Sequence, residues 1–305
     1  MPKPALIIMA AGMGSRYGGT KQAQPVGASD QLLADYALYD AMRAGFETAI
    51  LVIRPSMADD FPDQLRGRVG NRLKLRFVVQ SLEDLPPGHA VPSGRVKPWG
   101  TGHAVYACRH VADSPVAVIN ADDYYGPASY RAMFDFLSAL EPGASGLYAM
   151  VGYRLGNTLS ENGTVSRGIC TLNDAGQLLA IQEHPRIVKT PDGIRSTLGE
   201  EPPRRLPEDA VVSLNLWGFP SAFFGSLERQ FDDFLTRSMP DAPLTSELYL
   251  PEVVGKLVRD HQAKVAVLPT QEQWYGITYP EDLKAVASAI AAKTRSGQYP
   301  EQLWR

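Results

Sequence analysis

The stretch ALIIMAAGMGSRYGGTKQ, residues 5–22, decides the fold of this 305-residue chain. It opens with an apolar run, Ala5 to Met9, and continues into a loop with four glycines, Arg16 and Lys21. A short run rich in isoleucine and leucine that stops at glycine is typical of a buried parallel strand followed by a tight loop. Glycines let the backbone approach a ligand, and successive loop N–H groups can face one anion. With its two cations, the loop therefore predicts a polyphosphate site.

Other glycine-loop sites fit this spacing less well. The dinucleotide fingerprint needs G-x-G-x-x-G and later a second strand that carries a carboxylate. Here Gly18 falls one place late, and the next segment, 31–44, is predicted to be helical. A phosphate P-loop needs Gly-Lys-Ser or Gly-Lys-Thr, whereas this loop ends in the order Gly-Thr-Lys-Gln. A strand–turn with solvated charges is the simplest alternative, but it would not require all of these features in one loop.

The segment AAGMGSR, residues 10–16, followed by Lys21 resembles the nucleotide-binding loop of the sugar-phosphate nucleotidyltransferases, also called NDP-sugar pyrophosphorylases. That family has the pattern AAG-x-G-x-R, a spacer and a lysine. The resemblance implies that the loop at Ala11, Gly12 and Gly14 and the side chain of Arg16 hold nucleoside triphosphate phosphates. It also implies that Lys21 contacts the phosphates around the reacting phosphorus. The spacer before Lys21 is shorter than in many members, and the proline that often precedes the lysine is absent.

Composition narrows the class of protein. A hydrophobic content of 44% with 21% charged residues is ordinary for a globular chain. The net charge of -3 and pI ≈ 6.0 argue against a nucleic-acid partner. Cys108 and Cys170 are the only cysteines, which suggests a reducing compartment and no thiolate metal site. Since no apolar run suits a signal peptide or a membrane span, we expect a cytoplasmic protein without a membrane partner. A homo-oligomer is left open.

Strand and helix patterns alternate along the chain. Apolar runs predict strands at 5–9, 48–53, 73–80, 116–120, 147–153, 164–172, 178–183 and 211–219. Capped or amphipathic patterns predict helices at 31–44, 102–111, 127–140, 222–237, 246–260 and 280–293. This order predicts an α/β fold, a Rossmann-like three-layer sandwich with a mainly parallel central sheet and an added β-rich acceptor-binding region.

We treat residues 1–305 as a single nucleotidyltransferase domain. In this interpretation, residues 1–126 form the nucleotide-binding half, and residues 127–305 form the acceptor-binding half and the C-terminal helices. Two stretches rich in proline, glycine and charge, 84–98 and 190–207, are expected to be surface loops near a site because neither separates two self-sufficient cores.

The segment Asn120-Ala121-Asp122-Asp123 ends one of the predicted buried strands. Ligands bind at the carboxyl ends of parallel strands, so these carboxylates should emerge near the first loop. Carboxylates that face a polyphosphate need a cation, and Mg²⁺ suits both kinds of oxygen. The resemblance implies that Asp122 is the metal ligand, with Asp123 as its substitute or as a helper through water. Capping of the following turn is the structural alternative.

The segment WGTGHA, residues 99–104, resembles the family's contact to the base and ribose. There the backbone of Gly100 and the helix start at Thr101 would form a flat gap for the base. Thr101 could instead be only an N-cap, and His103 is expected to be structural. Gln80 resembles the glutamine that reads a pyrimidine base in some members. The uridylyltransferases that make UDP-N-acetylglucosamine carry a Gln where this chain has Pro98, so the base stays open.

The resemblance also places a second metal ligand before the last helix. Many members carry an Asp where this chain has Gly276, and another branch has an Asn where this chain has Thr278. We expect Thr278 to be the second ligand, although its hydroxyl is neutral and weaker than a carboxylate.

The acceptor side departs from the family pattern. The family's Glu-Lys-Pro, whose lysine binds the sugar phosphate, reads here as Glu183-His184-Pro185, and Arg186 or Lys189 could replace the lysine. The resemblance implies that Glu161, Glu183 and Asn215 contact the acceptor.

Together with these features, the resemblance implies an enzyme that converts an NTP and a sugar 1-phosphate to an NDP-sugar and pyrophosphate by Mg²⁺-dependent in-line attack. A phosphorylated acceptor that is not a sugar is one alternative, because the Glu-Lys-Pro segment is altered. A catalytically silent nucleotide-sugar-binding protein is another, because Gly276 marks a lost ligand.

Overall fold

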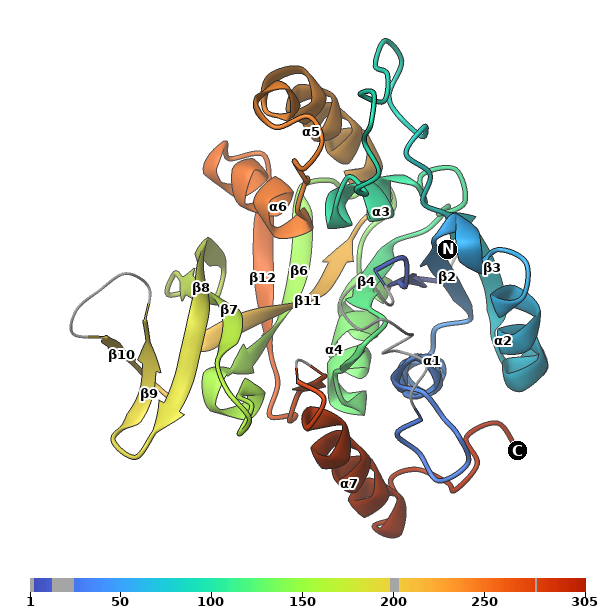
Figure 1. The fold of residues 1–305 in the computed structure, drawn as a ribbon, viewed down its shortest axis with the longest axis vertical. Helices are drawn as coiled ribbons and strands as arrows, with labels where there is room; N and C mark the ends of the chain where they lie inside the picture. Colours follow the sequence, from blue (N-terminus) through green and yellow to red (C-terminus); the bar gives the residue numbers. More distant parts are fainter. Residues whose placement is uncertain (1–2, 13–24, 198–202, 278) are drawn as a thin grey trace.

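The structure is a computed structural model that describes residues 3–12, 25–197, 203–277 and 279–305. Within these residues, 11 strands form one mixed sheet and two more form a small separate sheet. Figure 1 shows the large sheet in the middle of the molecule, with helices around it.

The parallel core of the sheet is built from the strands of the first half. They run in the order β3–β2–β1–β4 and comprise β1 (Ala5–Met9), β2 (Thr48–Ile53), β3 (Lys74–Val79) and β4 (Val116–Asn120). Ala5 pairs with Thr48 on one side and with Val116 on the other, so β1, β2 and β4 start in register. Their carboxyl ends therefore reach the same edge of the sheet.

Beyond β4 the sheet becomes largely antiparallel. The strand β11 (Val211–Phe219) pairs with β4 and also with β6 (Leu147–Arg154) and β7 (Val165–Leu172). The outer strands are β8 (Leu178–Thr190), β9 (Gly193–Ser196) and β10 (Arg204–Leu206), while β12 (Lys264–Pro269) runs parallel to β6. The stretch 190–207, expected to be a loop, thus carries β9 and β10, and that expectation was wrong.

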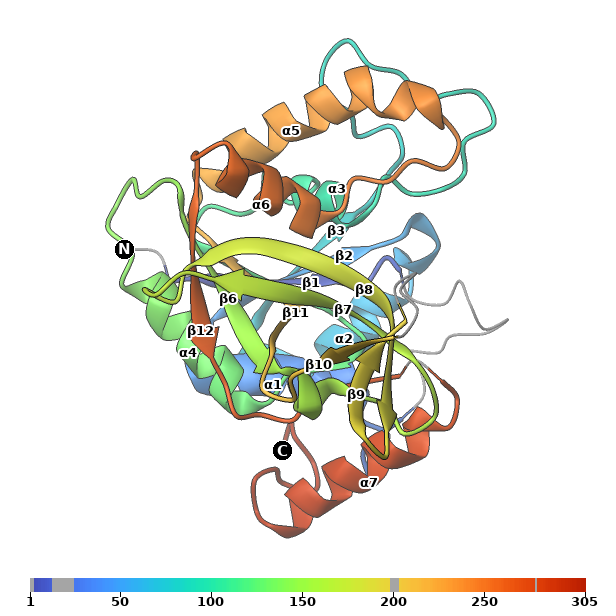
Figure 2. The same cartoon turned by 90° about the vertical axis from the view of Figure 1, so that its left-hand side faces the viewer.

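Helices cover both faces of the parallel core, as Figure 2 shows. Side chains of β1 alternate between the two faces: Leu6 and Ile8 enter one buried cluster, and Ile7 enters the other. The first cluster includes α1 (Leu33–Ala44), α2 (Phe61–Val69) and α4 (Pro127–Ser138). The second includes α3 (Thr101–Tyr106), α5 (Phe223–Arg237) and α6 (Leu250–Arg259). This arrangement confirms the predicted three-layer α/β sandwich with parallel strands at its core.

The end of the chain returns to the first helix. α7 (Asp282–Arg295) contributes Val286 and Ile290 to a third buried cluster, which also contains Tyr36 of α1 and Tyr299. The Tyr299 hydroxyl donates a hydrogen bond of 2.7 Å to the buried carboxylate of Asp40. Among the described residues, no helix is long and apolar enough to cross a membrane.

Candidate active site

A cavity of about 1460 Å³ opens at the carboxyl edge of the parallel strands. Its lining includes residues just beyond these strands: Arg54 and Gln80 directly follow β2 and β3, Gly12 comes shortly after β1, and Asp122 comes shortly after β4. This is the edge at which open α/β sheets bind ligands.

The cavity brings together predicted site residues from distant parts of the sequence. Its far walls come from the start of α3, from β8 and β11, and from α6 with the segment before it. The predicted residues in its lining are Ala11, Gly12, Gln80, Gly100, Thr101, Asp122, Glu183 and Asn215.

Other predicted residues are not placed at this cavity. Glu161 is not among the residues that line it, and its exposed carboxylate pairs with Nζ of Lys189 at 2.9 Å. The predicted residues Gly14, Arg16, Lys21 and Thr278 lie outside the described residues. Their roles, and the acceptor role of Glu161, stay predictions.

The two aspartates after β4 occupy different environments. Asp122 is half-buried and lines the cavity. Asp123 is buried, and its Oδ2 accepts hydrogen bonds from Asn120 Nδ2 at 2.8 Å and from the Tyr125 hydroxyl at 3.1 Å. Burial, and then the charge of Asp122, raise the pKa of Asp123 to about 7. Of the two carboxylates, Asp122 is therefore the one in position to meet a ligand.

A divalent ion fits Asp122 only if the ligand supplies further oxygens. In the described part of the chain, no three His, Cys, Asp or Glu side chains are grouped to hold a metal by themselves. Mg²⁺ usually binds one or two carboxylates together with substrate phosphates and waters. The donor set at Asp122 fits that pattern.

Two glycines of the cavity lining, Gly12 and Gly100, differ in what surrounds them. A Cβ added to Gly12 would meet no atom of the described residues within 4 Å. Gly100 has a φ of +96°, and a Cβ there would lie 2.6 Å from the carbonyl oxygen of Leu248. Glycine at position 100 is therefore required by the backbone conformation and by the segment that leads into α6.

Thr101 links α3 to α6. Its hydroxyl accepts a hydrogen bond of 2.9 Å from the backbone N–H of Leu250, the first residue of α6. Gly100 occupies the N-cap position of α3, without a side-chain cap. The alternative that Thr101 caps its own helix is thus wrong, because Thr101 satisfies the N-terminus of a different helix.

Asn215 sits at an irregularity of β11. The register of β11 against β6 shifts between Ser213 and Trp217, and Asn215 has a φ of +61°. Asparagine tolerates this left-handed conformation better than most residues, and bulges of this kind redirect side chains beside binding sites. The bulge accounts for the presence of a residue from inside a strand in the cavity lining.

Glu183 and His184 of the altered Glu183-His184-Pro185 segment lie on opposite faces of β8. Glu183 lines the cavity and accepts a short hydrogen bond from the Ser166 hydroxyl. His184 is buried, with Nδ1 2.8 Å from the hydroxyl of Ser196. The family's lysine position therefore brings no cation to this cavity.

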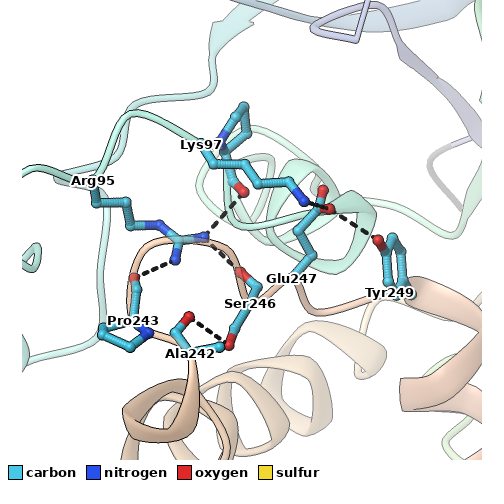
Figure 3. Close-up of polar contacts among 8 residues, drawn as sticks. Arg95, Lys97, Ala242, Pro243, Ser246, Glu247 and Tyr249 are labelled. Atoms are coloured by element: carbon cyan, nitrogen blue, oxygen red, sulfur yellow. Dashed lines mark hydrogen bonds and ion pairs between the residues drawn. The ribbon is translucent and has the colours of Figure 1, made fainter.

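Two features of the lining were missed from the sequence. Arg54 follows β2 directly, as Gln80 follows β3, and its Nε is buried with no hydrogen-bond partner among the described residues. Lys97 Nζ pairs with Glu247 Oε2 at 2.5 Å, and this oxygen also accepts the hydroxyl of Tyr249 at 2.9 Å (Figure 3). The position of Arg54 after an apolar run could have revealed it, whereas the second group depends on a tertiary contact.

Gly276, where many family members carry an Asp, faces a packing constraint. It pairs with Asp123 between the short strands β13 (Tyr275–Gly276) and β5 (Asp123–Tyr124). A Cβ at this position would lie 2.1 Å from the ring of Trp274, and the guanidinium of Arg167 lies over that ring at 4.5 Å. Any side chain at position 276 would thus displace the Trp274 ring.

Comparison with known proteins agrees with this architecture. Residues 5–293 match the sequence model of a family described as nucleotidyl transferase. Comparison with curated protein sequences finds no match. The fold is similar to the structure of the inositol-1-phosphate CTP transferase from T. maritima, with a TM-score of 0.58 and 13% identity over 94% of this chain and 96% of that chain.

Proposed function

The chain belongs to the nucleotidyl transferase family, and on this basis we propose that it transfers a nucleotidyl group from an NTP to the phosphate of a sugar 1-phosphate. The products are an NDP-sugar and pyrophosphate, and the reaction depends on Mg²⁺. The observation that carries the proposal is the cavity that joins Gly12, Gln80 and Asp122 at the carboxyl ends of neighbouring parallel strands.

The reaction requires alignment and charge neutralisation and no covalent intermediate. An oxygen of the acceptor phosphate attacks the α-phosphorus, the bond from the α-phosphorus to the bridging oxygen breaks, and pyrophosphate leaves with that oxygen. No atom of the described residues lies within 4 Å of a Cβ placed on Gly12, which supports a phosphate position beside this residue. Mg²⁺ held by Asp122 would neutralise phosphate charge in the transition state. Arg54 supplies a guanidinium, a group whose donors suit phosphate oxygens.

A phosphorylated acceptor that is not a sugar is the second candidate. Two observations favour it. His184, at the position of the family's sugar-phosphate lysine, is buried against Ser196 and away from the cavity lining. The structurally similar protein from T. maritima is described as a transferase acting on inositol 1-phosphate with CTP.

The test is pyrophosphate release by the purified chain with each of the four common ribonucleoside triphosphates, Mg²⁺ and a panel of acceptors. The panel contains hexose 1-phosphates, amino-sugar 1-phosphates, inositol 1-phosphate and phosphorylated short-chain alcohols. Release with one sugar 1-phosphate, together with the matching NDP-sugar by mass spectrometry, is the expected result. Release only with an inositol or alcohol phosphate would establish the second candidate. Nucleotide binding without release under any condition would contradict both.

A further inference from the structure

We propose that His103 is a positioning residue for the nucleotide base, because it fixes the side-chain amide of Gln80 so that Oε1, and not Nε2, faces the bound base. This inference rests on the proposed function, since it assumes that the cavity holds a nucleotide. It assigns a role to a side chain that the sequence marks only as structural.

The donor end of the Gln80 amide is fully occupied by the protein. Nε2 lies 3.1 Å from the carbonyl oxygen of Gly100 and 3.1 Å from Nδ1 of His103. An amide nitrogen carries two hydrogens, and these two partners use both. If the amide were reversed, Oε1 would face the carbonyl oxygen of Gly100, an arrangement of two acceptors without a hydrogen between them.

The protonation of His103 is set by its other nitrogen. Nε2 lies 2.9 Å from the carbonyl oxygen of Asp84, which can only accept, so Nε2 carries the hydrogen. The ring is fully buried, and burial lowers the pKa of His103, which favours the neutral form. In this tautomer Nδ1 has a lone pair and accepts a hydrogen from Gln80.

The far end of this chain of hydrogen bonds is held rigidly. The carboxylate of Asp84 pairs with Arg109 through both oxygens, at 2.6 and 2.9 Å. Trp99 Nε1 donates to the carbonyl oxygen of Leu82 at 3.0 Å, which attaches the same loop to the segment before α3. The carbonyl that orients His103 is thus fixed from two sides.

The occupied Nε2 of Gln80 restricts which base the cavity can bind. With Nε2 committed, Gln80 can offer the base only the acceptor Oε1, so the base must present an N–H to it. A base that presents an oxygen or an unprotonated ring nitrogen there would leave two acceptors facing each other, which is costly in a desolvated site. Gln80 and Arg54 follow the register pair Val79 and Ile53 of β3 and β2, so the two residues are neighbours in the cavity lining.

The experiment compares His103→Leu with His103→Asn in the full chain. Leucine removes the acceptor at the Nδ1 position, whereas asparagine can place its Oδ1 there. Affinities and kcat/KM values are measured for the four common ribonucleoside triphosphates with Mg²⁺. We expect His103→Leu to reduce the ratio between the best and the worst nucleotide by about tenfold, and His103→Asn to retain most of it. An unchanged ratio in a folded His103→Leu protein would overturn the inference.

A second measurement uses the unaltered protein and does not depend on how the variants fold. The preferred nucleotide is compared with an analogue in which methyl groups replace the base N–H hydrogens of the pairing edge. The inference predicts that the analogue binds about tenfold more weakly, and equal binding would contradict it. If the unaltered protein bound no nucleotide at all, the proposed function would fail as well. If it bound nucleotide and released pyrophosphate, but neither the His103 variants nor the methylated analogue changed nucleotide selection, only this inference would fail.

Discussion

The guanidinium carbon of Arg95 lies 3.5 Å from the centre of the Trp99 ring, and both side chains are buried. The same guanidinium donates to the carbonyl oxygens of Pro243 at 2.7 Å, Ser246 at 2.6 Å and Pro98 at 3.2 Å (Figure 3). It therefore joins the segment before α3 to the segment before α6. Both segments contribute residues to the cavity lining.

Replacing Arg95 with alanine should lower the free energy of unfolding by about 3 kcal/mol, because buried carbonyl groups lose their donor and the ring loses its cation. Lysine should not restore the loss, since it cannot reach three carbonyls in the geometry of a planar guanidinium. Urea denaturation measures the change. The control is Arg66→Ala, which removes a guanidinium 4.9 Å from the Phe77 ring on a side chain that is 55% exposed. Equal effects at the two positions would contradict the role of Arg95.

Arg54→Ala should weaken nucleotide binding by about tenfold or more with little loss of stability. The reason is that Arg54 lines the cavity and carries a guanidinium, a group whose donors suit phosphate oxygens. Titration calorimetry with the preferred NTP checks the affinity, and a thermal melt checks the fold. Unaltered affinity would remove Arg54 from the site.

Gly276→Ala should destabilise the protein by about 1–3 kcal/mol, the usual cost of overpacking, because its Cβ would lie 2.1 Å from the Trp274 ring. The matched control is Gly67→Ala in α2, where a Cβ meets no atom of the described residues within 4 Å and alanine should stabilise the helix by up to about 1 kcal/mol. Opposite signs in chemical denaturation are expected. A harmless Gly276→Ala would show that the pocket could have kept the family's aspartate.

The buried carboxyl of Asp40 should make stability depend on pH. Burial raises its pKa from 3.8 to about 7, although the Tyr299 hydroxyl opposes the shift. Since the folded state holds the proton more tightly than the unfolded state, this contribution is fully present below about pH 4 and is lost as the pH rises through about 7. The free energy of unfolding of the Asp40→Asn variant should therefore depend less on pH. As the pH rises from about 4 to about 7, this variant should gain about 2–4 kcal/mol of stability relative to the original chain. Parallel pH profiles of the two proteins would contradict the assignment.

Asp122→Asn should lower turnover by about a thousandfold or more, the scale expected when electrostatic stabilisation of a transition state is lost. The fold should survive, because Asp122 is half-buried at the cavity wall. Steady-state pyrophosphate release at saturating Mg²⁺ is the measurement. Asp135→Asn, at an exposed position of α4, provides a control with the same chemical change. Full activity in the Asp122 variant would reject Asp122 as the metal ligand.

Several strands could be predicted because local sequence signals define their ends, whereas β9, β10 and β12 were not predicted. β1, β2, β4 and β11 begin and end where the apolar runs predict, since glycine, proline or charged residues stop each run. The first helix begins at Leu33, later than predicted, because the carboxylate of Asp35 accepts the backbone N–H of Leu32 at 2.8 Å and fixes the start there. β10 was missed because Arg204–Leu206 acquires its extended form only by pairing with β9.

Part of the candidate site could likewise be predicted from the sequence, and part depends on tertiary contacts. Gly12, Gln80 and Asp122 could be predicted because each follows a recognisable strand. The α6 wall with Glu247 and Tyr249 could not, because it reaches the cavity through tertiary hydrogen bonds, among them Gly102 N–H to the Leu248 carbonyl at 2.8 Å. No pattern in either segment alone contains that contact.

We expect the cavity at the carboxyl ends of β1 to β4 to bind a nucleoside triphosphate whose divalent ion is held by Asp122. A crystal structure of the protein with its preferred NTP and Mn²⁺, with anomalous scattering used to locate the ion, tests it directly. We expect phosphates beside Gly12, the base at Gln80 and an anomalous peak within bonding distance of the Asp122 carboxylate. An empty cavity at saturating nucleotide, or a bound triphosphate whose ion lies away from Asp122, would contradict it.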